Sequence, residues 1–182
     1  MAVMGLGHFG YFVRDLEVMK DFWGNFMGMK LTKCNDGAAF YSADPQGVDH
    51  EIAIMQGPGP AHVAEGEDDA PLIQQLSLRV NSLNDVRDFK RRAIEKGYKI
   101  DRLVTHASAI GLYFRDPEGN RVETFWLTGL TSWAIVSVPI DIDRPDDEVM
   151  ADVRRVWEVS KRVEMGVMPA AGLKDAIRSL RD

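Results

Sequence analysis

Two stretches of the chain decide the fold: "YSADPQGVDHE" at residues 41–51 and "YFRDPEGNRVE" at residues 113–123. Both carry Tyr, Asp, Pro, Gly and Glu in the same order. A second pair precedes them at nearly the same separation, "HFGYFVRDLEVMKDFW" from His8 and "QLSLRVNSLNDVRDFK" from Gln75. Because two blocks recur in the same order, the chain contains an internal repeat.

Each repeat predicts a strand, a helix and then three strands. "LGHFGYFV" alternates as a half-buried strand does, and Asp15 follows as a helix cap. The second helix begins near Ser82 and stops at Gly97. We therefore predict an α+β fold of two βαβββ modules, about 5–57 and 72–127, forming a curved mixed sheet around a central metal cleft. His8 and Gln75 are repeat partners, and both are expected to point into that cleft.

The modules form a predicted domain at residues 1–130, followed by a helical extension at residues 131–182. Proline and acidic residues after Asp143 predict a helix at about 145–165, and a shorter one is expected near 170–180. "VPIDIDRP" should run extended. The Gly-, Pro- and acid-rich segment "GPGPAHVAEGEDDA" predicts a mobile linker between the modules. The apolar stripe of the extension indicates core or dimer packing, and we expect a homodimer.

Composition narrows the class of protein. The 182 residues are 45% hydrophobic and 27% charged, as in a globular domain. A net charge of −6 argues against nucleic acid or an anionic membrane as the partner. The sequence has no apolar run of membrane-spanning length, and Cys34 is its only cysteine. The stretch "MAVMGLGHFG" lacks the basic residues and long apolar core typical of a signal peptide. A reducing, cytoplasmic setting is expected.

Three residues on the predicted strands could hold a divalent metal. A histidine (His8), a carboxylate (Glu123) and an amide oxygen (Gln75), with open coordination positions, would suit Fe(II) or Mn(II). Each also has an ordinary structural explanation. His8 could be a satisfied strand histidine, Glu123 a solvated carboxylate and Gln75 an edge amide. The repeat symmetry favours the functional interpretation.

Several motifs resemble the vicinal oxygen chelate superfamily, which includes the glyoxalases, bleomycin resistance proteins and extradiol dioxygenases. They are "GLGHFGYFVRDL", "DHEIAI" and "HASAIGLYFRDPEGNRVETFW". Within it, the chain most resembles the small one-domain extradiol, catechol-type dioxygenases. The resemblance implies a facial triad of two His and one Glu on Fe(II), sometimes Mn(II). His8 then matches the first His and Glu123 the Glu. Gln75 departs from the triad, because it stands where the second His belongs.

The same resemblance implies three acid–base residues. His50 matches a histidine near bound oxygen, while His106 and Tyr113 match residues that contact the substrate hydroxyls. Such groups suit the chemistry, because a catechol must lose protons to chelate a metal. Without the resemblance, His106 could be a surface loop histidine and Tyr113 a packing residue.

One alternative concerns the adjacent residues His50 and Glu51, which must point to opposite faces of a strand. The repeat pairs Glu51 with Glu123, and a glyoxalase-type site would take ligands from His8, Glu51, Gln75 and Glu123. The dioxygenase pattern places His50 inside, and we favour it. The expected function is a metal-dependent extradiol dioxygenase that cleaves a catechol-like aromatic diol with O2. The alternatives are a glyoxalase-type lyase or isomerase and a ligand-binding protein of the same fold.

Overall fold

The computed structural model describes residues 6–57, 74–132 and 135–168. The chain divides into two compact units, described separately below. The first comprises residues 1–73 with 116–120, and the second comprises 74–115 with 121–182. Most of the predicted linker and the helix expected near 170–180 lie outside the described residues.

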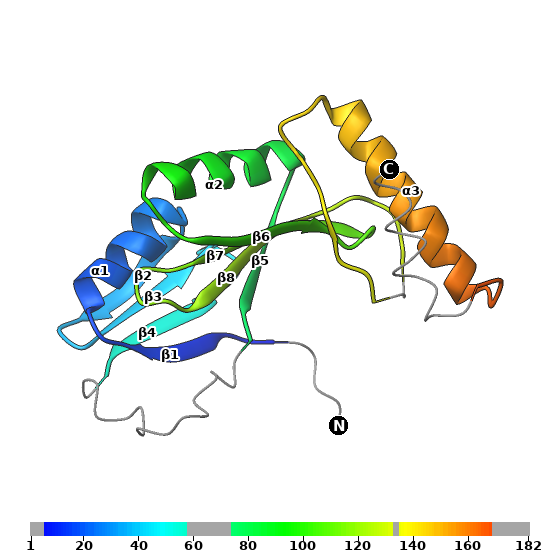
Figure 1. Cartoon of the computed structure of the whole chain (residues 1–182). Coiled ribbons are helices and arrows are strands. Elements are labelled where there is room, and N and C mark those ends of the chain that lie inside the picture. The colour runs from blue at the N-terminus through cyan, green and yellow to red at the C-terminus, as the bar shows by residue number, and fades with distance from the viewer. Residues whose placement is uncertain (1–5, 58–73, 133–134, 169–182) are drawn as a thin grey trace, which may run out of the picture. The chain divides into compact units, whose positions relative to one another are not determined.

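The first unit contains the strand, helix and three strands predicted from the repeat (Figure 1). Its elements are β1 (Phe9–Val13), α1 (Leu16–Asp21), the π-helical turn η1 (Phe22–Phe26), β2 (Lys30–Asn35), β3 (Ala38–Ser42) and β4 (Ile52–Gln56). The strands form one sheet in the order β1-β4-β3-β2, in which β1 runs parallel to β4. The side chains of one sheet face, such as Ile54 and Tyr41, are buried.

The second unit repeats this arrangement and adds one strand from the extension (Figure 1). Its elements are β5 (Leu76–Val80), α2 (Leu83–Glu95), β6 (Ile100–Thr105), β7 (Ala109–Arg115), β8 (Arg121–Leu127), β9 (Val138–Pro139) and α3 (Asp146–Glu164). The sheet order is β5-β8-β7-β6-β9, with β5 parallel to β8. The predicted α+β class and the two βαβββ modules are confirmed, with the hydrogen bonds forming one sheet in each unit.

The first helix begins at its predicted cap but changes its winding. Asp15 Oδ1 accepts the backbone N–H groups of Glu17 and Val18, both at 3.1 Å. From Phe22 the turn widens, because Met27 N donates to Phe22 O five residues back. The neighbouring aromatic residues of this turn, Phe22 and Trp23, are both fully buried and pack edge to face, with ring centres 5.1 Å apart.

Removing the cap of α1 should lower stability moderately. An Asp15→Ala variant leaves two N–H groups without their side-chain acceptor, so we expect the free energy of unfolding to fall by about 1 kcal/mol. Urea denaturation measures it. Asp36→Ala is the matched control, because it removes the same charge from an exposed turn. An equal loss in both variants would show that charge, and not capping, is responsible.

The strand registers differ from the alignment of the two repeated motifs. Gly10 lies opposite Ala53, whereas Ser77, its repeat partner, lies opposite Glu123. Ala53, and not Glu51, therefore occupies the position equivalent to Glu123. The reason is loop length: residues 43–51 join β3 to β4, but only residues 116–120 join β7 to β8. Aligning the turns consequently misaligns the strands that follow them.

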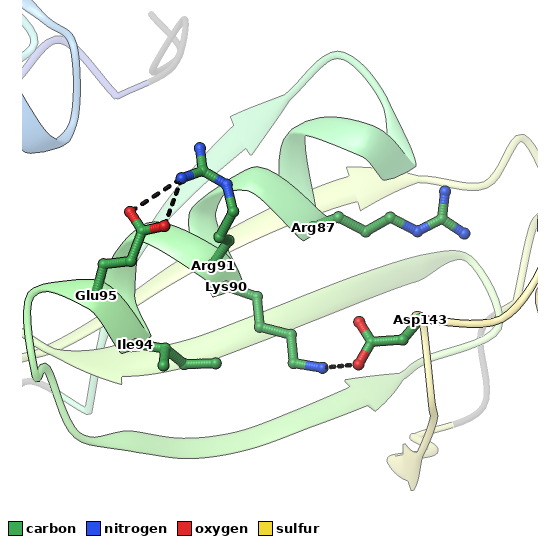
Figure 2. A pocket seen from close by; sticks show the side chains of 6 residues that line it. All are labelled: Arg87, Lys90, Arg91, Ile94, Glu95 and Asp143. Atoms are coloured by element: carbon green, nitrogen blue, oxygen red, sulfur yellow. Dashed lines mark hydrogen bonds and ion pairs between the residues drawn. The ribbon is translucent and has the colours of Figure 1, made fainter.

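The extension is attached to α2 and β6 of its own unit. Besides the β9–β6 pairing, Arg87 donates to the carbonyl oxygens of Ile142 and Arg144, and Lys90 pairs with Asp143 (Figure 2). Helix α3 buries one face, formed by Val149, Val153, Val156, Val159 and Ser160. No helix among the described residues has the length and apolar character needed to cross a membrane.

Candidate active site

A row of four polar side chains crosses the sheet of the second unit. Ser77 on β5 lies opposite Glu123 on β8, which lies opposite Tyr113 on β7. Tyr113 in turn lies opposite Arg102 on β6. Directly opposed residues project to the same face, so these four residues form what we call the polar row. Gln75 lies two residues before Ser77, so its side chain is on the same face of the chain as that of Ser77.

Glu123 is the centre of the polar row. Its side chain is only 6% exposed, and its Oε2 accepts hydrogen bonds from Gln75 Nε2 at 2.8 Å and Ser77 Oγ at 2.5 Å. Gly111 provides the space for the other carboxylate oxygen. A Cβ atom at Gly111 would lie 2.4 Å from Glu123 Oε1 and 3.1 Å from a ring carbon of Tyr113. The site therefore requires glycine at this position.

Gln75 presents an unused acceptor beside this carboxylate. Its amide nitrogen donates to both Ser77 and Glu123, but its Oε1 is buried without a hydrogen-bond partner among the described residues. A buried amide oxygen without a partner is costly, and a cation would satisfy it. A carboxylate and an amide oxygen from neighbouring strands suit a divalent cation such as Fe(II) or Mn(II). Gln75 and Glu123 therefore fit a divalent cation as two of its ligands.

Tyr113 is buried and protonated at neutral pH. Burial and, next, its hydrogen bond with Glu123 raise the pKa of Tyr113 to about 12, while the charge of Arg102 acts in the opposite direction. The hydroxyl lies 2.9 Å from His106 Nε2, so the structure brings two of the expected acid–base residues together. The guanidinium of Arg102 lies 4.0 Å from the centre of the phenol ring.

The hydrogen bonds of His106 determine which of its nitrogens carries the proton. Nδ1 lies 2.6 Å from Val136 O, and a carbonyl can only accept, so Nδ1 is protonated. In the neutral ring Nε2 is then an acceptor, so the single hydroxyl hydrogen of Tyr113 can be donated either to Nε2 or to Glu123. When His106 gains a proton, Nε2 donates instead and the hydroxyl hydrogen can turn to Glu123. The pair can thus pass one proton.

The backbone after His106 is held in a strained conformation. Ala107 has a φ of 64°, which side chains other than glycine rarely adopt. Its N–H donates to Thr105 Oγ1, and its carbonyl accepts from Thr128 Oγ1. Ala107 is also fully buried in an apolar cluster with Val136, Val138, Val156 and Val159 of the extension. The extension therefore helps to fix the loop that orients His106.

In the first unit, His8 and His50 lie side by side. Their ring centres are 4.5 Å apart, and His50 also packs edge-on against Phe40 at 5.1 Å. His50 Nδ1 donates to Asp49, which also pairs with Lys33. The bond from Lys33 and then that from His50 lower the pKa of Asp49. Both histidine rings thus occupy one side of the unit.

Glu51 points elsewhere. Its Oε2 accepts the backbone N–H of Ala43 at 2.6 Å, so this carboxylate closes the loop before β4. Its own N–H donates to Tyr41 O, and its carbonyl accepts from Phe9 N. Glu51 is therefore engaged by the backbone of its own loop, through the Ala43 N–H.

The expected ligands belong to different units, His8 to the first and both Gln75 and Glu123 to the second. Within the described ranges, no three side chains of the types His, Cys, Asp and Glu form a metal-binding group. The expected set counts an amide among its ligands. Sequence analysis did not find Arg102 or Gly111 as site residues, because nothing in either residue's immediate sequence signals a site.

The sequence of the chain matches the model of a known protein family. Residues 5–124 match the model of the Glyoxalase/Bleomycin resistance protein/Dioxygenase superfamily. The chain belongs to this superfamily. The match covers both βαβββ modules, including His8, Gln75 and Glu123. No curated protein is significantly similar to the chain in sequence.

Several solved protein structures share the fold of this chain. A glyoxalase/dioxygenase from Nostoc punctiforme is 15% identical, with a TM-score of 0.54 over 68% of this chain and 91% of that one. The fosfomycin resistance protein FosX from Listeria monocytogenes is 18% identical, with a TM-score of 0.53 over 70% and 97%. A lactoylglutathione lyase from Agrobacterium tumefaciens is 14% identical, with a TM-score of 0.51 over 69% and 96%. These similarities, all below 25% identity, show that the fold is shared.

Proposed function

We propose that the protein is a metal-dependent extradiol dioxygenase that cleaves the ring of a catechol-like aromatic diol with O2. The observation that carries this proposal is the hydrogen-bonded pair of Tyr113 and His106 beside the Glu123 carboxylate. A diol must lose protons before it can chelate a metal, and this pair offers an acceptor at His106 Nε2. The position of His50 beside His8 gives further support.

In this proposal His8, Gln75 and Glu123 hold Fe(II), or Mn(II) in its place. When bound, such a metal acts as a Lewis acid for the two diol oxygens and as a redox centre for oxygen. The free Oε1 of Gln75 supports its role as a ligand, since metal binding would satisfy that oxygen. His50 would supply or accept a proton on the side of His8, and Tyr113 would orient the second diol hydroxyl.

A glyoxalase-type lyase or isomerase is the second candidate, because some glyoxalases use glutamine as a ligand. Such a site would recruit Glu51 as a fourth ligand. The hydrogen bond from Ala43 to Glu51, and the alanine at the position equivalent to Glu123, favour the dioxygenase. A binding protein that retains the fold but holds no metal is the third candidate.

Oxygen consumption tests the proposal. The protein is reconstituted anaerobically with Fe(II) or with Mn(II) and then mixed with aerated catechols carrying different substituents. We expect one O2 consumed per diol and the visible absorbance of a ring-opened product. Metal binding without oxygen uptake by any diol would contradict the proposal and favour the lyase. An absence of metal binding would favour the ligand-binding protein.

Gln75→His should tighten metal binding. The substitution restores a triad of two His and one Glu, and imidazole is a stronger donor to Fe(II) than an amide oxygen. We expect the dissociation constant to fall by about 10-fold, even if turnover does not improve, because the new imidazole needs an acceptor for its other N–H. Anaerobic titration of Fe(II) and Mn(II) measures it. Equal dissociation constants for both proteins would remove Gln75 from the ligand set.

A further inference from the structure

Arg102 ends the polar row and is aimed at it by an irregularity in the sheet. The pairing of β6 with β7 shifts between Ile100 and Arg102, so that Asp101 is an extra residue in the strand. Such a bulge redirects the side chain that follows it. The first unit has the same shift between Leu31 and Lys33, which makes Lys33 the equivalent of Arg102. Both units thus direct a cation to one face of the sheet.

The two equivalent cations differ in their partners. Lys33 is neutralised by Asp49 at 2.7 Å. No carboxylate among the described residues pairs with Arg102, although its neighbour Asp101 is close in sequence. Asp101 is engaged by Arg115 at 2.8 Å and by Arg121 at 2.9 Å. Burial alone would raise the pKa of Asp101, but the hydrogen bonds from these two arginines lower it.

The cations along α2 differ from Arg102 in the same way. A surface hollow of about 350 Å³ is lined by Arg87, Lys90 and Arg91 (Figure 2). Each of these cations is neutralised by a carboxylate. Arg87 pairs with Asp146, Lys90 with Asp143 and Arg91 with Glu95. That hollow is the seam where the extension meets α2. Arg102 is exposed, and in place of a carboxylate it has the ring of Tyr113.

Stacking on Tyr113 fixes the guanidinium without using its hydrogen-bond donors. A planar guanidinium lying on an aromatic ring keeps its N–H edge free for a carboxylate. Glu123 does not take this role, because no ion pair joins it to Arg102 among the described residues; its Oε2 accepts from Ser77 and Gln75 instead. The result is an oriented cation, without a carboxylate partner in the part of the chain that the structure describes, at the end of a row that carries Glu123 and the Tyr113 hydroxyl.

We propose that Arg102 binds a carboxylate on the substrate, so that the preferred substrate is an aromatic diol carrying an acid group. This inference rests on the proposed function for the diol, but the anion site follows from the unpaired guanidinium alone. Two strand spacings separate Arg102 from Glu123 along the row, about 10 Å between their backbones. That separation suits a single aromatic ring with its diol at one end and its carboxylate at the other.

The test compares ligands that differ by one carboxylate. Anaerobic calorimetry on the full-length, Mn(II)-loaded protein measures the dissociation constants of 3,4-dihydroxybenzoate and catechol. We expect the acid to bind about 10- to 100-fold more tightly, as one charge-assisted contact allows. Arg102→Met should reduce this ratio to about one, while Arg102→Lys should retain part of it. The thermal midpoint of each variant verifies folding.

Arg79→Met is the matched control, because Arg79 is an exposed arginine of β5 that does not belong to the polar row. It should keep the preference for the acid. A preference that survives Arg102→Met, or that Arg79→Met abolishes equally, would overturn the inference. Binding of benzoate, followed by NMR, separates the two proposals. Benzoate binding lost in Arg102→Met supports the anion site even if no diol is oxidised. Oxidation of catechol without any preference for acids refutes the anion site alone.

Discussion

Replacing Glu123 with glutamine is expected to abolish metal-dependent activity and to weaken metal binding by about 100-fold or more. Loss of an outer-shell partner already costs 10- to 100-fold in many metal sites, and here a charged ligand is lost. The fold should persist, because a glutamine oxygen can still accept from Ser77 and Gln75. Elemental analysis after reconstitution, with an anaerobic Mn(II) titration, measures the effect. A Glu123→Gln protein with its full metal content would contradict the assignment of Glu123 as a metal ligand.

Glu51→Gln is the control for this variant, and it also separates the two candidate reaction classes. If the site is of the dioxygenase type, the substitution should leave metal affinity unchanged. Glu51 is bonded to the Ala43 N–H, and a glutamine oxygen can replace that bond. In a glyoxalase-type site Glu51 would be a ligand, and both variants would lose the metal. The two results cannot be confused, because each variant conserves side-chain size and removes one charge.

Gly111→Ala is expected to weaken metal binding and to lower the stability of the protein. The added methyl group would lie 2.4 Å from Glu123 Oε1, and Tyr113, at 3.1 Å, leaves it no room to shift. Glu123 cannot move away freely, since its other oxygen is held by Ser77 and Gln75. We expect metal affinity to fall by about 10-fold or more. The free energy of unfolding should fall by about 1–3 kcal/mol through overpacking.

Gly10→Ala is the matched control, because its nearest neighbour, Met55 Cε, would lie at 3.5 Å, an ordinary contact. It should preserve both metal affinity and stability. The first unit supports the reasoning for Gly111. Its equivalent residue is Ala38, opposite Met55, where Ala53 takes the place of the glutamate. Unchanged metal affinity in Gly111→Ala would show that Glu123 is not confined as the structure indicates.

The modules and their order could be predicted because their signals are local. Strand alternation, the Asp15 cap and the Pro–Gly turns each depend on a few neighbouring residues, and the repeat doubles every signal. The π-helical turn at Phe22 was not predictable, since it depends on how two adjacent aromatic residues pack together. The segment containing β9 was predicted to run extended, but its pairing with β6 was not, because two residues carry too little pattern to signal pairing.

Some residues of the candidate site could be named from the sequence and others could not, for a physical reason. His8, Gln75 and Glu123 could be named because motifs identify them, and His106 and Tyr113 because they occur in the same motif. Arg102 could not be named. Its role depends on a bulge and on the absence of a carboxylate partner among the described residues, and both are properties of strand pairing.

The sequence by itself determined the superfamily, the two βαβββ modules and the residues at which a metal site is proposed. Alternation and turn chemistry gave the modules because those signals lie within short segments, whereas the superfamily followed from motifs that resemble it and the proposed ligands from those motifs and the repeat. The tertiary structure decided which residues face one another. A loop at residues 43–51 longer than that at residues 116–120 shifts the strand register between the repeats. That shift gives Ala53 the place of a glutamate and turns Glu51 to a structural bond. Since strand side chains alternate, only the pairing itself fixes which face each side chain takes.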